Sequence, residues 1–335
     1  MGCLALLWFL ETVLADDFWL TTPLTYAPQW PFGLPTVALL AASIRFRNGR
    51  LSGLNGAAAI LFLFVFMGWC VPLSRPHPSG QILRLMTFNI KHGIRGEDGL
   101  VDVIRREKPD IACIQMADGY QGYQTFSVAG MAHLADYHFF WGGENLILSR
   151  YPIRTYVPPL ASRAGLARPA MMASVDFSGQ TLTLINLHMA KSRNGDTLLD
   201  HHASIQDYFE ETADIRLEQT SALLDWAYSI QGPLILCGDF NNPPRGRCYE
   251  QLRGVFHDAF AEVGCGFGYS YPADLPMMRI DFVFTTNGVV PLTAQVLHED
   301  VSDHQPLECT LAIPPLGGAN AKLTTAAHTM NALKS

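Results

Sequence analysis

The alternation of apolar and charged stretches divides the chain into two parts. Three apolar stretches lie near the N-terminus, at residues 1–15, 30–46 and 54–73, the first with Glu11 in its middle. The third holds twenty residues without a charge, which is enough for a helix to cross a hydrocarbon layer about 30 Å thick. The pattern predicts two to three transmembrane helices within residues 1–73.

The charges between these stretches predict their orientation. Arg45, Arg47 and Arg50 lie in the short link between the second and third stretches, whereas residues 16–29 contain two acids and no Lys or Arg. Since cationic links stay in the cytoplasm, the third helix runs outward. We therefore expect a bacterial inner-membrane protein whose remaining chain lies on the periplasmic or extracellular side. A cleaved signal peptide is the disfavoured alternative for the first stretch, because no basic residue lies near Met1.

The rest of the chain has the pattern of a large α/β (α+β) domain. Residues 74–81 form a Pro-rich linker, and short β-branched runs separated by turns follow from residue 82 to about 314. Two segments have helical periodicity, residues 99–108 and 214–229. The Ala- and Thr-rich tail, residues 315–335, predicts disorder. The predicted strands are ILRLMTFN, DIACIQM, NLILS, MMASVDF, LTLINLHM, PLILCGDF and RIDFVF.

Composition narrows the class of protein. Hydrophobic residues make up 49% of the chain and charged residues 16%, which excludes a disordered protein. The part after residue 80 is acidic, so nothing in its composition indicates the basic surface of a nonspecific nucleic-acid binder. The seven cysteines show no metal-type pair spacing. Cys248 and Cys265 could form a disulfide in an oxidising compartment.

Polar residues fall where the predicted strands end. The edge at which strands end is where open α/β sheets bind ligands. Any one of these residues alone would be ordinary turn chemistry, so their recurrence is the informative feature. They are Asn89, His188, Asp239, Asn241, Asp281, Asp303 and His304.

In this order, TFNI, IQ, NLH, GDFN, RIDF and SDH closely resemble the endonuclease/exonuclease/phosphatase superfamily, whose fold is apurinic-endonuclease- and DNase-I-like. The resemblance spans about residues 83–307. It implies a four-layer sandwich of two mixed β-sheets flanked by helices. It also implies metal-dependent hydrolysis of a phosphoester by direct attack of water, with Mg²⁺ or Mn²⁺ as cofactor. Lesser matches are Asn145 in NLILSRYPI and the helical pair Arg216 and Gln219.

The resemblance assigns roles to the water-binding and metal-binding residues. Asn89 and Asp303 would supply oxygen ligands to the cation, which suits a hard metal. Asp239 would hold or activate the attacking water, and Asn241 would orient that water or the phosphate.

Two histidines complete the implied catalytic set. His188 would donate a hydrogen bond to a phosphoryl oxygen. His304, oriented by Asp281, would act as an acid/base or phosphate-binding pair. The alternative for Asp281 is a salt bridge at a strand end. No activated Ser or Cys accompanies these residues, so a covalent intermediate is not expected.

One position departs from the family pattern. The strand DIACIQM would end in Gln-Glu, and that Glu would be a principal metal ligand, but this chain has Gln115-Met116. A thioether is a poor ligand for a hard cation. If the strand continues, Asp118 shares the face of Met116 and could replace the carboxylate. Otherwise the enzyme is weakened, or the domain is a catalytically dead relative that binds a phosphate ligand as a sensor.

The sequence leaves open the roles of several other polar residues and the identity of the substrate. Asp200, His201 and His202 are most simply a solvated turn, and Arg168, Lys191 and Arg193 could contact a substrate phosphate or face solvent. The expected partners are the lipid bilayer and a phosphoester substrate, which could be a lipid headgroup, a nucleotide or a nucleic acid. No obligate protein partner is expected.

Overall fold

A computed structural model describes residues 1–72, 80–118, 128–157, 170–189, 204–286 and 288–315. All but the first residue of the predicted tail and all but the last two residues of the predicted linker lie outside the described residues. So do the candidates Arg168, Lys191, Arg193, Asp200, His201 and His202.

Twelve described strands form two six-stranded sheets. The first has the order β11-β12-β1-β2-β4-β3, and the second has the order β5-β6-β7-β8-β10-β9. The first comprises β1 (Gln81–Asn89), β2 (Ile111–Gln115), β3 (His138–Gly142), β4 (Asn145–Ser149), β11 (Val290–Val296) and β12 (Leu307–Ile313). The second comprises β5 (Ile153–Val157), β6 (Met171–Phe177), β7 (Gln180–His188), β8 (Leu234–Asp239), β9 (His257–Asp258) and β10 (Asp281–Thr285).

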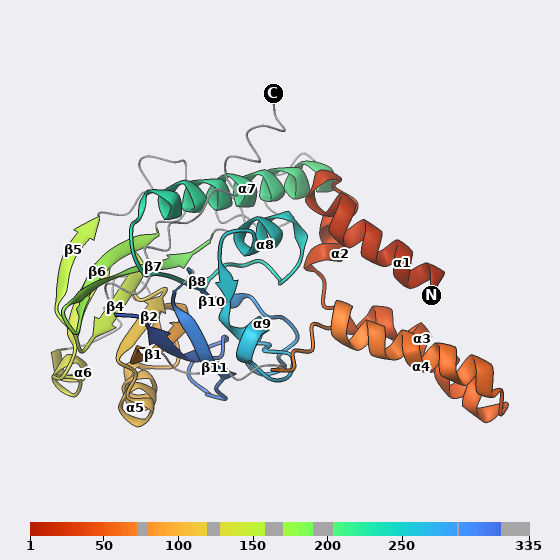
Figure 1. Ribbon diagram of the computed structural model, residues 1–335, viewed down its shortest axis with the longest axis horizontal. Coiled ribbons are helices and arrows are strands. Elements are labelled where there is room, and N and C mark those ends of the chain that lie inside the picture. Colours follow the sequence, from red (N-terminus) through yellow and green to blue (C-terminus); the bar gives the residue numbers. More distant parts are fainter. Residues whose placement is uncertain (73–79, 119–127, 158–169, 190–203, 287, 316–335) are drawn as a thin grey trace.

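Both sheets are mixed and pack face to face. β1 runs parallel to β2 and β7 runs parallel to β8, while the other pairs are antiparallel. Alternate side chains such as Leu85, Cys113 and Cys237 meet in the buried core between the sheets. The outer faces are covered by α5 (Glu97–Glu107) and α6 (Val128–Ala132) on one side and α7 (Ile205–Ser229) and α8 (Gly246–Arg253) on the other. The four-layer sandwich is confirmed (Figure 1).

All seven predicted strands are present, as are both predicted helices. Helix α7 begins earlier than predicted, at Ile205, where Ser204 caps it by accepting a hydrogen bond from the Asp207 amide. The short helix α9 (Ala259–Val263) packs beside β11. Cys248 is buried and Cys265 is exposed, and no disulfide joins them, so that alternative is not realised.

The N-terminal part is helical and apolar. α1 (Gly2–Phe9) continues through a π-helical turn to Leu14 and a 3₁₀ turn (Ala15–Asp17), and the short α2 (Thr22–Tyr26) follows. α3 (Trp30–Arg45) and α4 (Gly49–Leu61), which a π-helical turn (Phe62–Phe66) extends, lie side by side as a hairpin that projects from the sandwich (Figure 1). Gly33 permits their close approach, because a Cβ there would lie 2.5 Å from the Phe62 ring.

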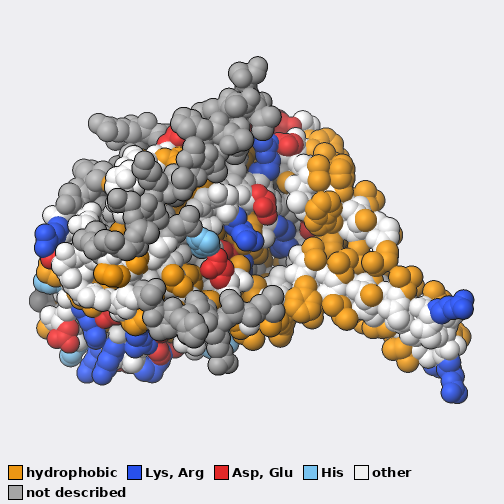
Figure 2. All heavy atoms as spheres, in the orientation of Figure 1, with side chains coloured by type: hydrophobic (Ala, Val, Ile, Leu, Met, Phe, Trp, Pro, Cys, Tyr) orange, Lys and Arg blue, Asp and Glu red, His pale blue; other side chains and the backbone are white. Residues whose placement is uncertain are grey.

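This helical hairpin carries its apolar side chains on the outside. Val37, Phe46 and Ile60 are at least 60% exposed, and Figure 2 shows hydrophobic atoms along the projecting hairpin with Lys or Arg atoms at its far end. Among the described residues, Gly49–Phe66 is the one helix long and apolar enough to cross a membrane. It ends at Phe66 rather than near residue 73, because Gly68 adopts a left-handed conformation (φ 69°) and the chain turns onto the sandwich.

Candidate active site

The strand register brings the predicted polar residues together. Asn89 and Gln115 are paired at the ends of the parallel strands β1 and β2. His188 and Asp239 are likewise paired at the ends of β7 and β8, and Asp281 lies opposite Asp239 at the start of β10. Because β7 and β8 end at the same edge, their last side chains meet there.

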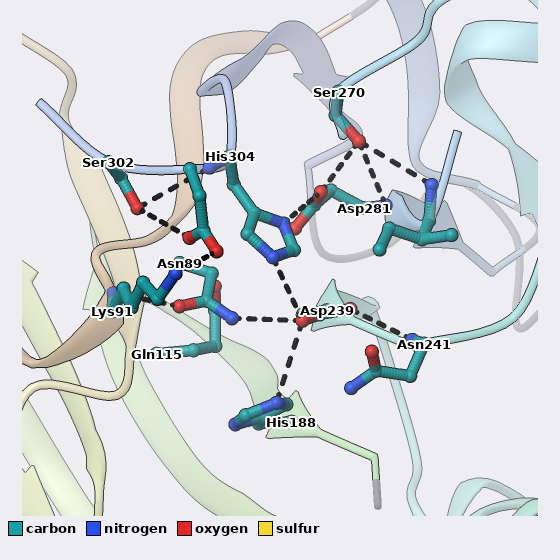
Figure 3. Close-up of polar contacts among 12 residues, drawn as sticks. Asn89, Lys91, Gln115, His188, Asp239, Asn241, Ser270, Asp281, Ser302 and His304 are labelled. Carbon is teal, nitrogen blue, oxygen red and sulfur yellow. Dashed lines mark hydrogen bonds and ion pairs between the residues drawn. The ribbon is translucent and has the colours of Figure 1, made fainter. Parts of the chain in front are cut away.

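Asp239 lies at the centre of the site and is 1% exposed. Its Oδ2 accepts a hydrogen bond from Asn89 Nδ2 at 2.9 Å, and its Oδ1 accepts one from the backbone amide of Asn241 at 2.8 Å. The Nε2 atoms of His188 and His304 lie 3.5 and 3.7 Å from the same Oδ2 (Figure 3). A single carboxylate oxygen is therefore the focus of one amide and two imidazoles.

His304 is held by Asp281, as predicted from the resemblance. The Nδ1 atom of His304 lies 2.9 Å from Asp281 Oδ2, which also accepts a hydrogen bond from Ser270 Oγ at 2.6 Å. Burial raises the pKa of Asp281. Burial alone would lower the pKa of His304, but the carboxylates of Asp281 and Asp239 raise it to about 9. His304 is thus a charged hydrogen-bond donor at neutral pH.

His188 has a carboxylate partner that the sequence did not predict. Glu144 Oε1 lies 3.0 Å from His188 Nδ1, and both side chains are largely buried. Glu144 lies in the turn between β3 and β4, and its carbonyl accepts a hydrogen bond from the Ala117 amide at 2.7 Å. The site therefore holds two carboxylate–imidazole pairs that face one carboxylate. A lone Glu in an unpredicted turn offered no motif by which to find it.

A buried amide network supports the site from below. Gln115 Nε2 donates hydrogen bonds to Asn186 Oδ1 at 2.7 Å and to Thr87 Oγ1 at 3.0 Å. Asn186 Nδ2 in turn donates to the carbonyls of Ile114 and Leu146. Because Asn186 belongs to the second sheet and its partners to the first, these bonds hold the two strand edges in register beneath the site.

Strained backbone surrounds the same edge. Lys91, His92, Met116 and Asn241, which follow β1, β2 and β8, all have φ between 46° and 56°. A non-glycine residue in this region costs about 1 kcal/mol or more, and such residues cluster at functional sites. The glycine of GDFN is required for packing, because a Cβ on Gly238 (φ 142°) would lie 1.9 Å from the Leu187 carbonyl oxygen.

The prediction for Asp118 relied on a continuing strand, and that premise is wrong. β2 ends at Gln115, and Met116 turns the chain through a left-handed conformation, so residues 116 and 118 do not share a strand face. Asp118 is instead half exposed and pairs with His92 Nδ1 at 2.7 Å. Asp303 lies next to His304, and its Oδ2 contacts Lys91 Nζ at 2.7 Å.

The donor set fits a hard divalent cation. Atoms of Asp239, Asp281 and His304 all lie within 4.8 Å of one another. Because a charged His304 cannot bind a cation, the ligands in this cluster would be the carboxylate oxygens of Asp239 and Asp281. Two buried oxygens that face this region, Asn241 Oδ1 and Asp281 Oδ1, have no hydrogen-bond partner within the described part of the chain. Carboxylate and amide oxygens are the ligands that Mg²⁺ and Mn²⁺ prefer.

Replacing Glu144 tests whether its pairing with His188 matters. We expect Glu144→Gln to lower kcat by about 10²-fold, because the amide keeps the shape but replaces the carboxylate that lies beside His188 Nδ1 and orients the ring. Phosphoester hydrolysis under steady-state conditions measures this. Glu250→Gln on the exposed face of α8 is the matched control. An unchanged kcat in Glu144→Gln would show that the contact is structural only.

An α/β sandwich of two mixed sheets with a buried carboxylate–imidazole site at its strand edge is a DNase-I-like fold. The model of the endonuclease/exonuclease/phosphatase family matches residues 86–304, and the chain belongs to this family. The UPF0294 protein of Yersinia pseudotuberculosis is 26% identical over 249 residues, which cover 71% of this chain and 86% of that protein.

Solved structures support the fold. An endonuclease/exonuclease/phosphatase from Bacteroides vulgatus superposes with a TM-score of 0.53 at 17% identity, covering 70% of this chain and 99% of that one. A humanised TDP2 from D. rerio gives 0.51 at 17% identity, covering 69% and 98%. A mannosyl-6-phosphatase from Bacteroides thetaiotaomicron gives 0.50 at 16% identity, covering 68% and 99%.

Proposed function

We propose that the protein is a membrane-anchored, divalent-metal-dependent phosphoester hydrolase of the phosphodiesterase, endonuclease or phosphatase type. The observation that carries this proposal is the convergence of His188 and His304, each backed by a carboxylate, on the buried carboxylate of Asp239. Family membership supports the reaction class.

The residues suggest how water is activated and the phosphoryl group is held. Asp239 takes a hydrogen bond from the attacking water and Asn241 orients it. A cation held by the carboxylates of Asp239 and Asp281, with Asn89 and Asp303 as the further oxygen ligands that the resemblance implies, would neutralise charge on the phosphoryl oxygens. His188 and His304 donate from Nε2 to these oxygens, and the charged His304 can pass its proton to the leaving oxygen.

The exposed apolar hairpin supports membrane anchoring. Its two helices carry large apolar side chains toward solvent, and Arg45, Arg47 and Arg50 are exposed around its turn. An 18-residue helix is about 27 Å long, close to the thickness of a hydrocarbon layer. By the positive-inside rule, the Arg turn is cytoplasmic, which assigns the sandwich to the periplasmic or extracellular side of a bacterial membrane.

The test is hydrolysis of a generic aryl phosphodiester by the full chain in mild detergent, with Mg²⁺, with Mn²⁺ and with EDTA. We expect turnover with metal, none with EDTA, and a loss of at least about 10²-fold in His304→Ala. Calorimetric titration with Mn²⁺ measures metal binding independently of turnover. EDTA-resistant hydrolysis would contradict the proposed metal dependence.

Met116 motivates the rival reading, a noncatalytic phosphate-binding or sensor domain. That reading predicts a folded protein with no turnover in either metal, and activity appearing in Met116→Glu, which supplies the family's carboxylate. We expect the unmodified chain to be active, because the other residues of the site are intact and Glu144 adds a carboxylate from the turn between β3 and β4.

A further inference from the structure

One loop links the apolar N-terminal segment with the hydrogen-bonded pair Asp281 and His304, which we call the catalytic pair. Residues 264–272, which follow α9, contact the chain just past the apolar helix. Cys70 and Gly266 exchange backbone hydrogen bonds of 2.8 and 3.0 Å, and Tyr269 donates from its hydroxyl to the Met67 carbonyl at 2.9 Å. The Trp69 ring meets Phe267 edge-on with centroids 4.7 Å apart. We call residues 264–272 the connecting loop.

Ser270 and Tyr271, which follow Tyr269 in the connecting loop, contact the catalytic pair. Ser270 Oγ donates to Asp281 Oδ2 at 2.6 Å, and the Tyr271 ring lies 4.7 Å from the His304 ring, centroid to centroid. One peptide bond therefore separates Tyr269, which holds the end of the apolar helix, from Ser270, which holds the carboxylate that positions His304. Because Tyr269 and Ser270 are adjacent in the chain, their Cα atoms lie only about 3.8 Å apart.

A second contact between the N-terminal segments and the sandwich lies close in sequence to Asn241 of the site. Arg245, four residues after Asn241, donates from Nε to the Thr25 carbonyl at 2.8 Å and from Nη1 to the Phe66 carbonyl at 3.1 Å. Arg245 is half-buried, and this burial lowers the pKa of its guanidinium. The Arg216 guanidinium also lies over the Tyr26 ring, 4.0 Å from its centroid.

These contacts determine how far the site can move from the bilayer. A domain on a flexible tether could turn toward bulk solvent, but this one is held at two places to the segments that flank the apolar hairpin. Trp69 and Tyr269 also suit the headgroup layer, where Trp and Tyr gather at the ends of membrane spans. The reacting centre is thereby attached to the end of the apolar helix rather than to a free tether.

We propose that the substrate is a phosphoester carried by a membrane lipid and hydrolysed at the bilayer surface. This inference rests on the proposed hydrolase function. The water oxygen bonds to phosphorus, the bond from phosphorus to the leaving oxygen breaks, and that oxygen takes the proton lost by the water. The acidic sandwich agrees with this substrate class, because long nucleic acids would meet no overall positive charge.

The test compares matched lipid and soluble substrates with the full chain in phosphatidylcholine vesicles and Mn²⁺. Phosphatidic acid is paired with glycerol 3-phosphate, and phosphatidylglycerol with glycerophosphoglycerol. We expect one lipid to be cut with a kcat/KM at least about 10²-fold above that of its soluble partner. Tyr269→Phe, which removes the hydrogen bond to Met67, should lower this ratio about fivefold, whereas Tyr228→Phe on exposed α7 should not change it.

The outcomes distinguish a failure of the lipid-substrate proposal from a failure of the proposed hydrolase activity. Equal or better hydrolysis of the soluble partners, or of a single-stranded oligonucleotide, overturns the lipid assignment and leaves the hydrolase intact. Hydrolysis of the generic aryl diester without cleavage of either lipid does the same. If the aryl diester is not cut in any metal, the proposed hydrolase itself fails.

Discussion

Asp239→Asn is expected to lower kcat/KM by about 10³-fold or more while the protein stays folded. The side chain keeps its shape, and the remaining oxygen can still accept a hydrogen bond from the Asn241 amide. At Oδ2, however, an NH₂ group would meet the donor of Asn89 and the two imidazoles instead of a carboxylate oxygen. The change removes the acceptor proposed for the attacking water and a carboxylate charge that lies beside both imidazole rings.

Steady-state hydrolysis of the aryl phosphodiester measures this loss, and thermal unfolding checks the fold. Asp102→Asn on the exposed face of α5 makes the same chemical change away from the site and should leave the rate unchanged. If Asp239→Asn keeps more than about a tenth of the activity, the reaction does not depend on this carboxylate and the proposed site is wrong.

The parts of this site that could be predicted belong to buried parallel strands and their motifs. Runs such as PLILCGDF are apolar on both faces, so strand and strand end could be located together, and Asn89, His188, Asp239 and Asp281 lie where expected. Five strands were not predicted: β3, β5, β9 and β11, which lie at the sheet edges, and β12, which lies inside the first sheet. In the edge strands β3 and β11 the apolar pattern is weak because part of each strand is exposed.

The predictions that were wrong or missing depended on backbone conformation and on contacts between distant segments, which a short stretch of sequence does not encode. Asp118 was assigned by strand alternation, but Met116 takes a left-handed conformation and ends that alternation. Glu144 reaches His188 only because β4 pairs with β2, a relation between segments about thirty residues apart. The apolar run to residue 73 predicted a longer helix. The helix ends earlier, and the carbonyls of Phe66 and Met67 accept hydrogen bonds from Arg245 and Tyr269 of the sandwich.

A buried ion pair anchors the strand that carries Asp281. Arg279 Nη1 donates to both carboxylate oxygens of Asp258, at 2.9 and 2.8 Å, and the two side chains are 4% and 1% exposed. Asp258 Oδ2 also accepts a hydrogen bond from the Tyr249 hydroxyl at 2.8 Å. The Arg279 guanidinium lies 4.7 Å from the Phe282 ring centroid. Removing one partner would therefore leave an uncompensated charge among apolar and aromatic groups.

Arg279→Met is accordingly expected to lower the free energy of unfolding by about 3–5 kcal/mol. Urea unfolding of the full chain in mild detergent, followed by Trp fluorescence, measures the change. Adding Asp258→Asn should recover part of the loss, since the stranded charge is removed together with its partner. Arg154→Met, which breaks the exposed pair with Asp176, is the matched control and should cost less than about 1 kcal/mol. Equal losses in Arg279→Met and Arg154→Met would show that burial of the Arg279–Asp258 pair does not stabilise the start of β10.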